Sequence, residues 1–301
     1  MPTQPLSETT VVLNLELGRV SNRRKLDSDT DIIETDVDRN MLHLSVDLFD
    51  AAELRKCQGF LNSLKARIRA LTVPSFLRGG MYLVKVEGVE TVNAILEQAK
   101  DEFAPLVQAF ADVVDERRDE SKERLGRAYD PGQYPSRDNV LSAFSITWRW
   151  LALTTPSSLK KISQAFFDRE AKKAEDSFRS AVDDINALLA LEAKKLLDHM
   201  IDRLTPDEDG KPKIFRNSAI SNLTSFLSNF SMRNIGTSDE LNEYVERMRS
   251  LMEGVSPDDL RNSDRLREDM ANGFAVVSEA LDSLVMTRPN RFIDLKRSAD
   301  A

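Results

Sequence analysis

The two histidines are the first side chains to test for chemistry. His199 follows Asp198 in a helical stretch, with Lys195 and Asp202 nearby, and a carboxylate in this position can orient an imidazole as a general base. A histidine among charged neighbours is also typical of an ordinary exposed helix face, and we favour this interpretation. His43 falls in a predicted strand and has the same interpretation. Neither histidine is therefore predicted to be catalytic.

Acidic residues offer a second kind of chemistry, the binding of a hard metal ion. Asp183 and Asp184 are adjacent, and a longer acidic run covers residues 112–120. Both are mixed closely with lysine and arginine, which favours exposed helix faces over metal sites. The sequence also has no glycine-rich phosphate loop, no CxxC pair, no HExxH and no Gly-x-Ser-x-Gly. We therefore predict no catalytic residue, no cofactor site and no metal site, and we expect that the protein is not an enzyme.

Aromatic and basic clusters are better candidates for binding. Tyr129, Tyr134, Trp148 and Trp150 lie close together in the sequence, and such residues dominate contact energies at protein interfaces. A helix starting at Ser136 would place Trp148 on its apolar side and Trp150 roughly 200° away. Trp150, Tyr129 and Tyr134 are therefore the predicted partner-binding aromatics, and Trp150 is the predicted exposed anchor.

The basic cluster comprises Arg19, Arg23, Arg24 and Lys25. It suits phosphate or an acidic protein surface, but four charges without interleaved aromatics are more typical of an ordinary solvated loop, and we favour that interpretation. Nucleic-acid binding through this loop, with residues 211–216 as a further contribution, is the alternative function.

Composition favours a helical protein. The chain has 301 residues, of which 31% are charged, and only 11 are glycine and 11 proline. The net charge of −8 comes from 42 basic and 50 acidic residues that are interspersed, so neither a polycation nor an extended polyanion is indicated. The single cysteine, Cys57, excludes an internal disulfide and predicts a cytoplasmic location. The sequence shows no secretion signal and no membrane-spanning stretch.

The first part of the chain predicts a small α+β region. Apolar residues alternate over 11–17 and 42–48, and residues 81–86 form a third strand candidate. The polar stretch 18–40 between the first two strands is predicted to be a mobile loop. Apolar residues at steps of three and four predict a helix over 51–72, which Pro74 ends.

Longer helices follow. The heptad positions of the first are Val92, Leu96, Ala99, Phe103, Leu106, Phe110 and Val113, and they predict a coiled-coil seam that is kinked at Pro105. Between Pro156 and Pro206 there are 49 residues without glycine or proline; as one helix, capped by Ser157 or Ser158, they would be roughly 72 Å long. A helix of that length needs other long helices beside it. Three shorter helices are predicted over 214–232, 238–253 and 257–286.

Four segments resemble an uncharacterised helical family of bacteriophage and mobile-element proteins. They are VVLNLELGRVSNRRKL, RGGMYLVKVEG, YDPGQYPSRDNVLSAFS and SPDDLRNSDRLREDMANGFAVVSEALDSLVMTRPNRFIDL. The resemblance implies a phage or integrated-element origin and genes beside a cobalt-chelatase-like AAA+ ATPase. It implies no catalytic residue. Members of the family continue from the double glycine into a Tyr-Ala-Val-Pro turn, whereas residues 81–86 of this chain have a more strand-like sequence.

These observations predict a mainly α protein, an elongated helical bundle or coiled coil with a small β element near the N-terminus. The expected regions are an α+β region over 1–88 with the mobile loop 18–40, a coiled-coil body over 89–205, a linker over 206–213, and helices over 214–301. The predicted function is that of a non-catalytic adaptor or assembly protein in the bacterial cytoplasm. It would bind protein partners, with an AAA+ ATPase as one candidate, and form homo-oligomers.

Overall fold

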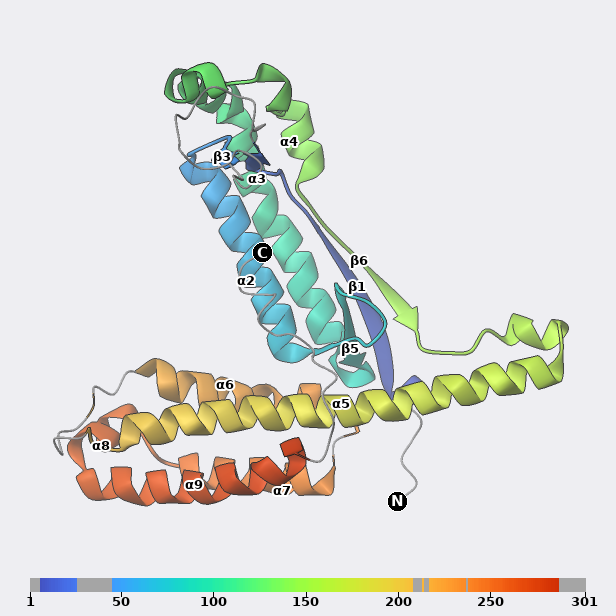
Figure 1. Cartoon of the computed structure of the whole chain (residues 1–301), viewed down its shortest axis with the longest axis vertical. Coiled ribbons are helices and arrows are strands. Elements are labelled where there is room, and N and C mark those ends of the chain that lie inside the picture. Colours follow the sequence, from blue (N-terminus) through green and yellow to red (C-terminus); the bar gives the residue numbers. More distant parts are fainter. Residues whose placement is uncertain (1–5, 26–44, 208–212, 214–216, 237, 287–301) are drawn as a thin grey trace, which may run out of the picture. The chain divides into compact units, whose positions relative to one another are not determined.

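The computed structural model describes residues 6–25, 45–207, 213, 217–236 and 238–286. The chain divides into two compact units (Figure 1). We call Val11–Ala152 the sheet unit, and Met1–Thr10 with Leu153–Ala301 the bundle unit. The fold is mostly helical with a small β sheet, as predicted. The division differs from the expected one, because the body expected over 89–205 is shared between the units. Among the described residues, no helix is long and apolar enough to cross a membrane.

A four-stranded sheet in the order β4-β5-β1-β6 forms one layer of the sheet unit. Its strands are β1 (Thr10–Gly18), β4 (Val73–Pro74), β5 (Met81–Lys85) and β6 (Ser145–Ala152). β1 pairs antiparallel with β6 over its whole length, and β4 pairs antiparallel with β5. The predicted strands at 11–17 and 81–86 are therefore confirmed. Gly18 is required in β1 because a Cβ there would lie 2.4 Å from the carbonyl oxygen of Ala143.

Two long helices, α2 (Ala52–Leu71) and α3 (Val89–Leu125), pack beside each other in this unit. The predicted helix 51–72 is confirmed, and its apolar stripe from Leu54 to Ile68 is buried. In α3 the predicted heptad positions are buried as far as Phe103. After Pro105 the predicted position Phe110 is also buried, whereas Leu106 and Val113 are only partly buried and their neighbours Val107 and Val114 are buried. The proline is inside the continuous helix.

The segment after Ser136 differs from the prediction. Helix α4 covers only Arg137–Ala143, and the residues that follow form β6 instead of a longer helix. Valine, phenylalanine and tryptophan recur there at helical spacing, but the stretch is also rich in the β-branched and aromatic residues typical of strands. Pairing with β1 decides the outcome, since it supplies backbone hydrogen bonds along the whole segment. Short 3-10 helices connect α3 to α4, at Gly126–Ala128 and Pro131–Gln133.

The region expected to be a mobile loop is partly ordered. Val20 is buried, and β2 (Arg23–Lys25) pairs antiparallel with β3 (Ser45–Asp47). An exposed loop over the whole of 18–40 is therefore wrong for residues 18–25. Residues 26–40, and His43 with its two leucine neighbours, lie outside the described residues. Of the strand expected over 42–48, the structure has the three residues of β3.

The bundle unit is built around α5 (Gln164–Leu204), a helix of 41 residues. The long helix is confirmed, but its N-cap is Ser163, whose hydroxyl accepts from the Phe166 amide. The start expected at Ser157 or Ser158 is wrong, because residues 157–161 form a separate 3-10 helix, η5 (Ser157–Lys161). A short helix, α1 (Leu6–Thr9), precedes β1.

The C-terminal half of α5 carries the core of the bundle unit (Figure 1). It packs mainly against α9 (Asp264–Met286) and also against α6 (Asn217–Arg233), while α7 (Asp239–Met252) packs on α9. The single helix expected over 257–286 is divided by Ser263 into α8 (Pro257–Asn262) and α9. The first turn of α8 is fixed by a capping box between Ser256 and Asp259. The turn before α7 needs Gly236, whose φ is +64°.

Candidate functional site

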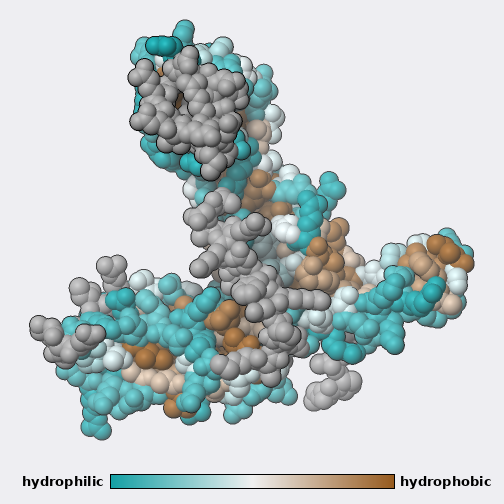
Figure 2. Space-filling model, viewed as in Figure 1, coloured by the Kyte–Doolittle hydropathy of each residue, from teal (hydrophilic) through white to brown (hydrophobic). Residues whose placement is uncertain are grey.

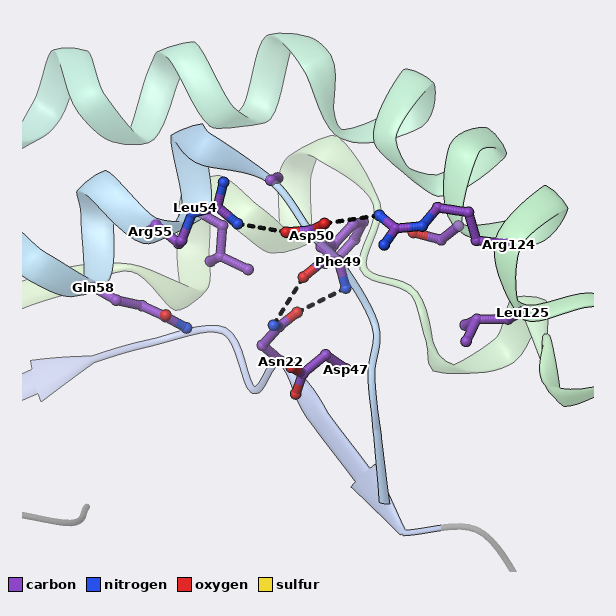
Figure 3. Close-up of a pocket in the computed structure, with 11 residues that line it drawn as sticks. Asn22, Asp47, Phe49, Asp50, Leu54, Arg55, Gln58, Arg124 and Leu125 are labelled. Carbon is purple, nitrogen blue, oxygen red and sulfur yellow. Dashed lines mark hydrogen bonds and ion pairs between the residues drawn. The ribbon is translucent and has the colours of Figure 1, made fainter. Parts of the chain in front are cut away.

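A cavity of about 520 Å³ lies in the sheet unit, where α2 begins and α3 ends (Figure 3). Its lining is mixed, with apolar side chains such as Leu54 and Leu125 beside charged ones. The charged residues that line it are Asp47, Asp50, Arg55 and Arg124.

Asp50 is the centre of this group. It accepts a hydrogen bond from Arg55 at 2.5 Å and from Arg124 at 2.9 Å, so one carboxylate links α2 to α3 (Figure 3). Hydrogen bonds from Arg124 and Arg55, with the attraction of their charges, lower the pKa of Asp50 below its ordinary value. A carboxylate held ionised in this way is a poor proton donor and a weakened base.

The other polar groups of the cavity also serve the fold. The Asn22 side chain donates to the Phe49 carbonyl at 3.0 Å and accepts from the Phe49 amide at 2.8 Å. The Ser121 hydroxyl donates to the carbonyl of Arg117, and Asp47 pairs with Arg23 at 3.6 Å. The arrangement joins the start of α2 to β2 and to the end of α3, and its charges are paired with each other.

Two members of the predicted basic cluster have acidic partners in the same unit. Arg23 pairs with Asp47, and Arg24 donates to the Ala128 carbonyl at 3.4 Å and lies 3.8 Å from Asp130. Arg19 and Lys25 are exposed. Three of the four charges are therefore consecutive in β2, Arg19 lies in the connection before it, and two of the four have acidic partners.

The predicted aromatic residues lie mostly inside the sheet unit. Tyr134 is 9% exposed, and its ring is 5.2 Å from Phe49 and 5.0 Å from Tyr129. Burial raises the pKa of the Tyr134 hydroxyl. Tyr129 is only partly buried. Neither tyrosine projects from the surface as a binding anchor would.

Trp150 is not the exposed anchor that the helical interpretation predicts. In β6 it lies two residues from Trp148, on the same face of the strand, and both are partly buried. Both indole nitrogens donate to the same oxygen, Oδ1 of Asn93 in α3, at 3.0 Å from Trp148 and 3.2 Å from Trp150. Asn93 was missed because it has no motif of its own. The Trp-x-Trp spacing, taken as a strand, was the signal that could have pointed to a shared partner.

His199 is exposed, and its carboxylate neighbours interact elsewhere. Asp198 accepts from the Ser278 hydroxyl at 2.6 Å, and Asp202 accepts from Lys213 at 2.6 Å. Hydrogen bonding by Lys213 is the main cause that lowers the pKa of Asp202. These interactions favour the interpretation of His199 as a surface residue. Among the described residues, no three potential metal ligands cluster.

The N-terminal half of α5 is the most unusual surface of the bundle unit. No residue of the segment 164–180 is buried, whereas a buried position recurs in every later turn from Ala181 to Leu204. Within this unit, α6, α7 and α9 lie along the C-terminal half of α5 and leave the N-terminal half uncovered (Figure 1).

Apolar side chains nevertheless line this half of the helix. We define the α5 stripe as Phe166, Phe167, Ala171 and Ala174, which are partly exposed, together with Ile162 just before the helix, which is 73% exposed. Figure 2 shows apolar surface at the end of the bundle unit where α5 begins. The stripe has the same spacing of three and four residues as the buried seam that follows it, so it extends the core face of α5 beyond the bundle.

Comparison with known proteins gives no match to a protein-family model, to a curated protein or to a solved structure.

Proposed function

We propose that this protein is a non-catalytic helical adaptor, which binds another protein through the α5 stripe. The observation that carries the proposal is an apolar helix face that continues past the end of its own bundle. Helices in water owe most of their stability to the packing of an apolar face, and in segment 164–180 no residue is buried, so this packing is incomplete there. A partner helix would supply it.

The size of the stripe suits a helical partner. Segment 164–180 is about 25 Å long, enough for more than four turns of side-by-side packing. Each large apolar side chain that becomes fully buried contributes about 1.5–3 kcal/mol before ordering costs. Phe166, Phe167 and Ile162 are three such side chains on adjoining turns. The small Ala171 and Ala174 would allow the partner to approach closely, and the spacing of three and four suits coiled-coil packing.

The remaining parts of the proposal come from the sequence. A phage or mobile-element origin, an AAA+ ATPase as the partner, and a cytoplasmic location are all compatible with a binding face of this kind. In an alternative version of the proposal the protein self-associates, and a second copy of the chain binds the α5 stripe. The non-catalytic role is supported by the pairing of the charged cavity residues, Asp50 with Arg55 and Arg124 and Asp47 with Arg23 beside the cavity.

Site-specific photocrosslinking in host cells tests this proposal. A benzophenone side chain would be placed in turn at Ile162, Phe167 and Ala174 on the stripe, and at Arg169 and Asp176 on the opposite side as matched controls. Crosslinks to a single protein at the stripe positions, without crosslinks at the controls, would support the adaptor. Crosslinks of equal yield at both sets of positions, or none on the stripe, would refute it.

A further inference from the structure

Strand β6 is an open edge of the sheet unit. The sheet has the order β4-β5-β1-β6, so among the described residues β6 has a neighbouring strand, β1, on one side only (Figure 1). β6 is eight residues long and pairs with β1 in an unbroken register, without a bulge. Proteins commonly protect such an edge with lysine, proline or a bulge; β6 has none of these, and its one charged residue is Arg149. An edge of this kind can accept a further strand.

The backbone groups that point to the open edge can be assigned. Leu15 in β1 lies opposite Trp148, but its amide donates to the carbonyl of Gly80, just before β5, at 3.1 Å. In an antiparallel pair, opposite residues either exchange both backbone hydrogen bonds or point these groups away from each other. The amide and carbonyl of Trp148 therefore point to the open edge, and by alternation those of Ile146 and Trp150 do so too.

The side chains along this edge form two sets. Those on the side of α3 are Ile146, Trp148 and Trp150, and both indoles are only partly buried although they donate to Asn93. Those on the other side of the sheet are exposed, and they are Thr147, Arg149 and Leu151. An added strand would therefore cover apolar surface of both tryptophans in addition to pairing the backbone.

We propose that the added strand is β6 of a second copy of the chain, which pairs antiparallel and joins the two sheets across a twofold axis. When Trp148 lies opposite Trp148 of the second copy, Ile146 lies opposite Trp150, and their outward backbone groups can form roughly six hydrogen bonds. Each tryptophan then packs beside an apolar side chain of the other copy, which is a favourable cross-strand pair. On the other side of the sheet, Arg149 lies opposite the uncharged Thr147. The strand is thus complementary to itself.

Other registers are less favourable. A shift by one residue would place Trp148 opposite a residue whose backbone groups already bond to β1, so hydrogen bonds would be lost. Shifts by two residues place either Arg149 opposite the same arginine of the second copy, which opposes like charges, or Trp150 opposite Phe144, which precedes the strand. The inference does not depend on the proposed function, because β6 lies in the sheet unit and the α5 stripe in the bundle unit.

Light scattering of the full-length protein measures the association. The wild type should be a dimer at micromolar concentration. Thr147→Arg should weaken the dimer about tenfold, because each new arginine faces Arg149 of the other copy. In the monomer the same arginine lies opposite Glu16 of β1, so the variant should fold. Ser63→Arg, on the exposed face of α2, makes the same change of charge and should dimerise as the wild type does.

Cysteine crosslinking tests the register, and the native Cys57 is buried. Thr147→Cys mixed with Arg149→Cys should form a disulfide between chains, because opposite residues at these positions have Cα atoms about 4.5 Å apart. Thr147→Cys mixed with Leu151→Cys should not, since diagonal positions are about 7–8 Å apart. A monomeric wild type, or equal crosslinking in the two mixtures, would overturn the inference. A dimer that Phe167→Ser dissociates and Thr147→Arg leaves intact would also overturn it, and would instead support self-association through the α5 stripe.

Discussion

Replacing Asn93 with alanine should destabilise the sheet unit by about 1 kcal/mol. The Asn93 side chain accepts hydrogen bonds from both Trp148 and Trp150, and each neutral hydrogen bond contributes about 0.5–1.5 kcal/mol to stability. Both indoles are partly exposed, so water can replace part of the loss, which favours the lower half of that range. Alanine also gains up to about 0.7 kcal/mol of helix propensity in α3.

Urea unfolding followed by tryptophan emission measures this effect directly. The chain has two tryptophans and both are in β6, so the emission reports on the sheet unit alone. The midpoint for Asn93→Ala should fall, and the native emission should change as the indole N–H groups lose their acceptor. Glu97→Ala, an exposed position one turn further along α3, is the control and should leave both quantities near the wild-type values.

A mutant cycle decides whether the shared acceptor is the cause. In a Trp148→Phe and Trp150→Phe background, with unfolding followed by circular dichroism, Asn93→Ala should cost nothing or stabilise slightly through helix propensity. If alanine destabilises this background as much as the wild type, the two hydrogen bonds do not explain the loss, and our account of β6 against α3 is wrong.

Three further predictions concern single residues. Pro105→Ala should stabilise the sheet unit by about 1–3 kcal/mol in urea, because it restores a backbone donor inside α3; a loss of stability would mean that packing requires the proline. Cys57 is fully buried, and burial raises the pKa of its thiol to about 11, so alkylation of the thiol should require unfolding. The unfolded thiol ionises from about pH 9, so the folded state should lose stability as the pH rises from about 9 toward 11. Fast alkylation of the folded protein at about pH 8 would contradict this. Glu192→Gln should destabilise the bundle unit by about 1–3 kcal/mol in thermal melts, because both carboxylate oxygens of Glu192 accept hydrogen bonds from the buried Arg233 guanidinium. Glu279→Gln, at an exposed position, is the control. Equal melting temperatures of the two variants would refute a stabilising role for the Glu192–Arg233 pair.

Local hydrophobic periodicity correctly predicts those helices and strands whose sequence fits only one period. The alternation at 11–17 predicts a strand and the stripe from Leu54 to Ile68 predicts a helix with one buried face, and the structure confirms both elements, although Val12 is buried on the opposite face of the strand. The segment 145–152 fits two periods, and the choice depends on β1, which lies more than a hundred residues earlier in the chain. No local rule contains that information, so the error there also misplaced Trp150.

The exposure of the α5 stripe is also not predictable from local sequence. The spacing of three and four residues continues from Phe167 into the buried seam of α5 without a change that would mark where its cover ends. Coverage is decided by α6 and α9, and breaks far along the chain, after Arg233 and at Ser263, determine where α6 ends and α9 begins. Because a covered and an uncovered turn have the same pattern, sequence predicts the stripe but not its exposure.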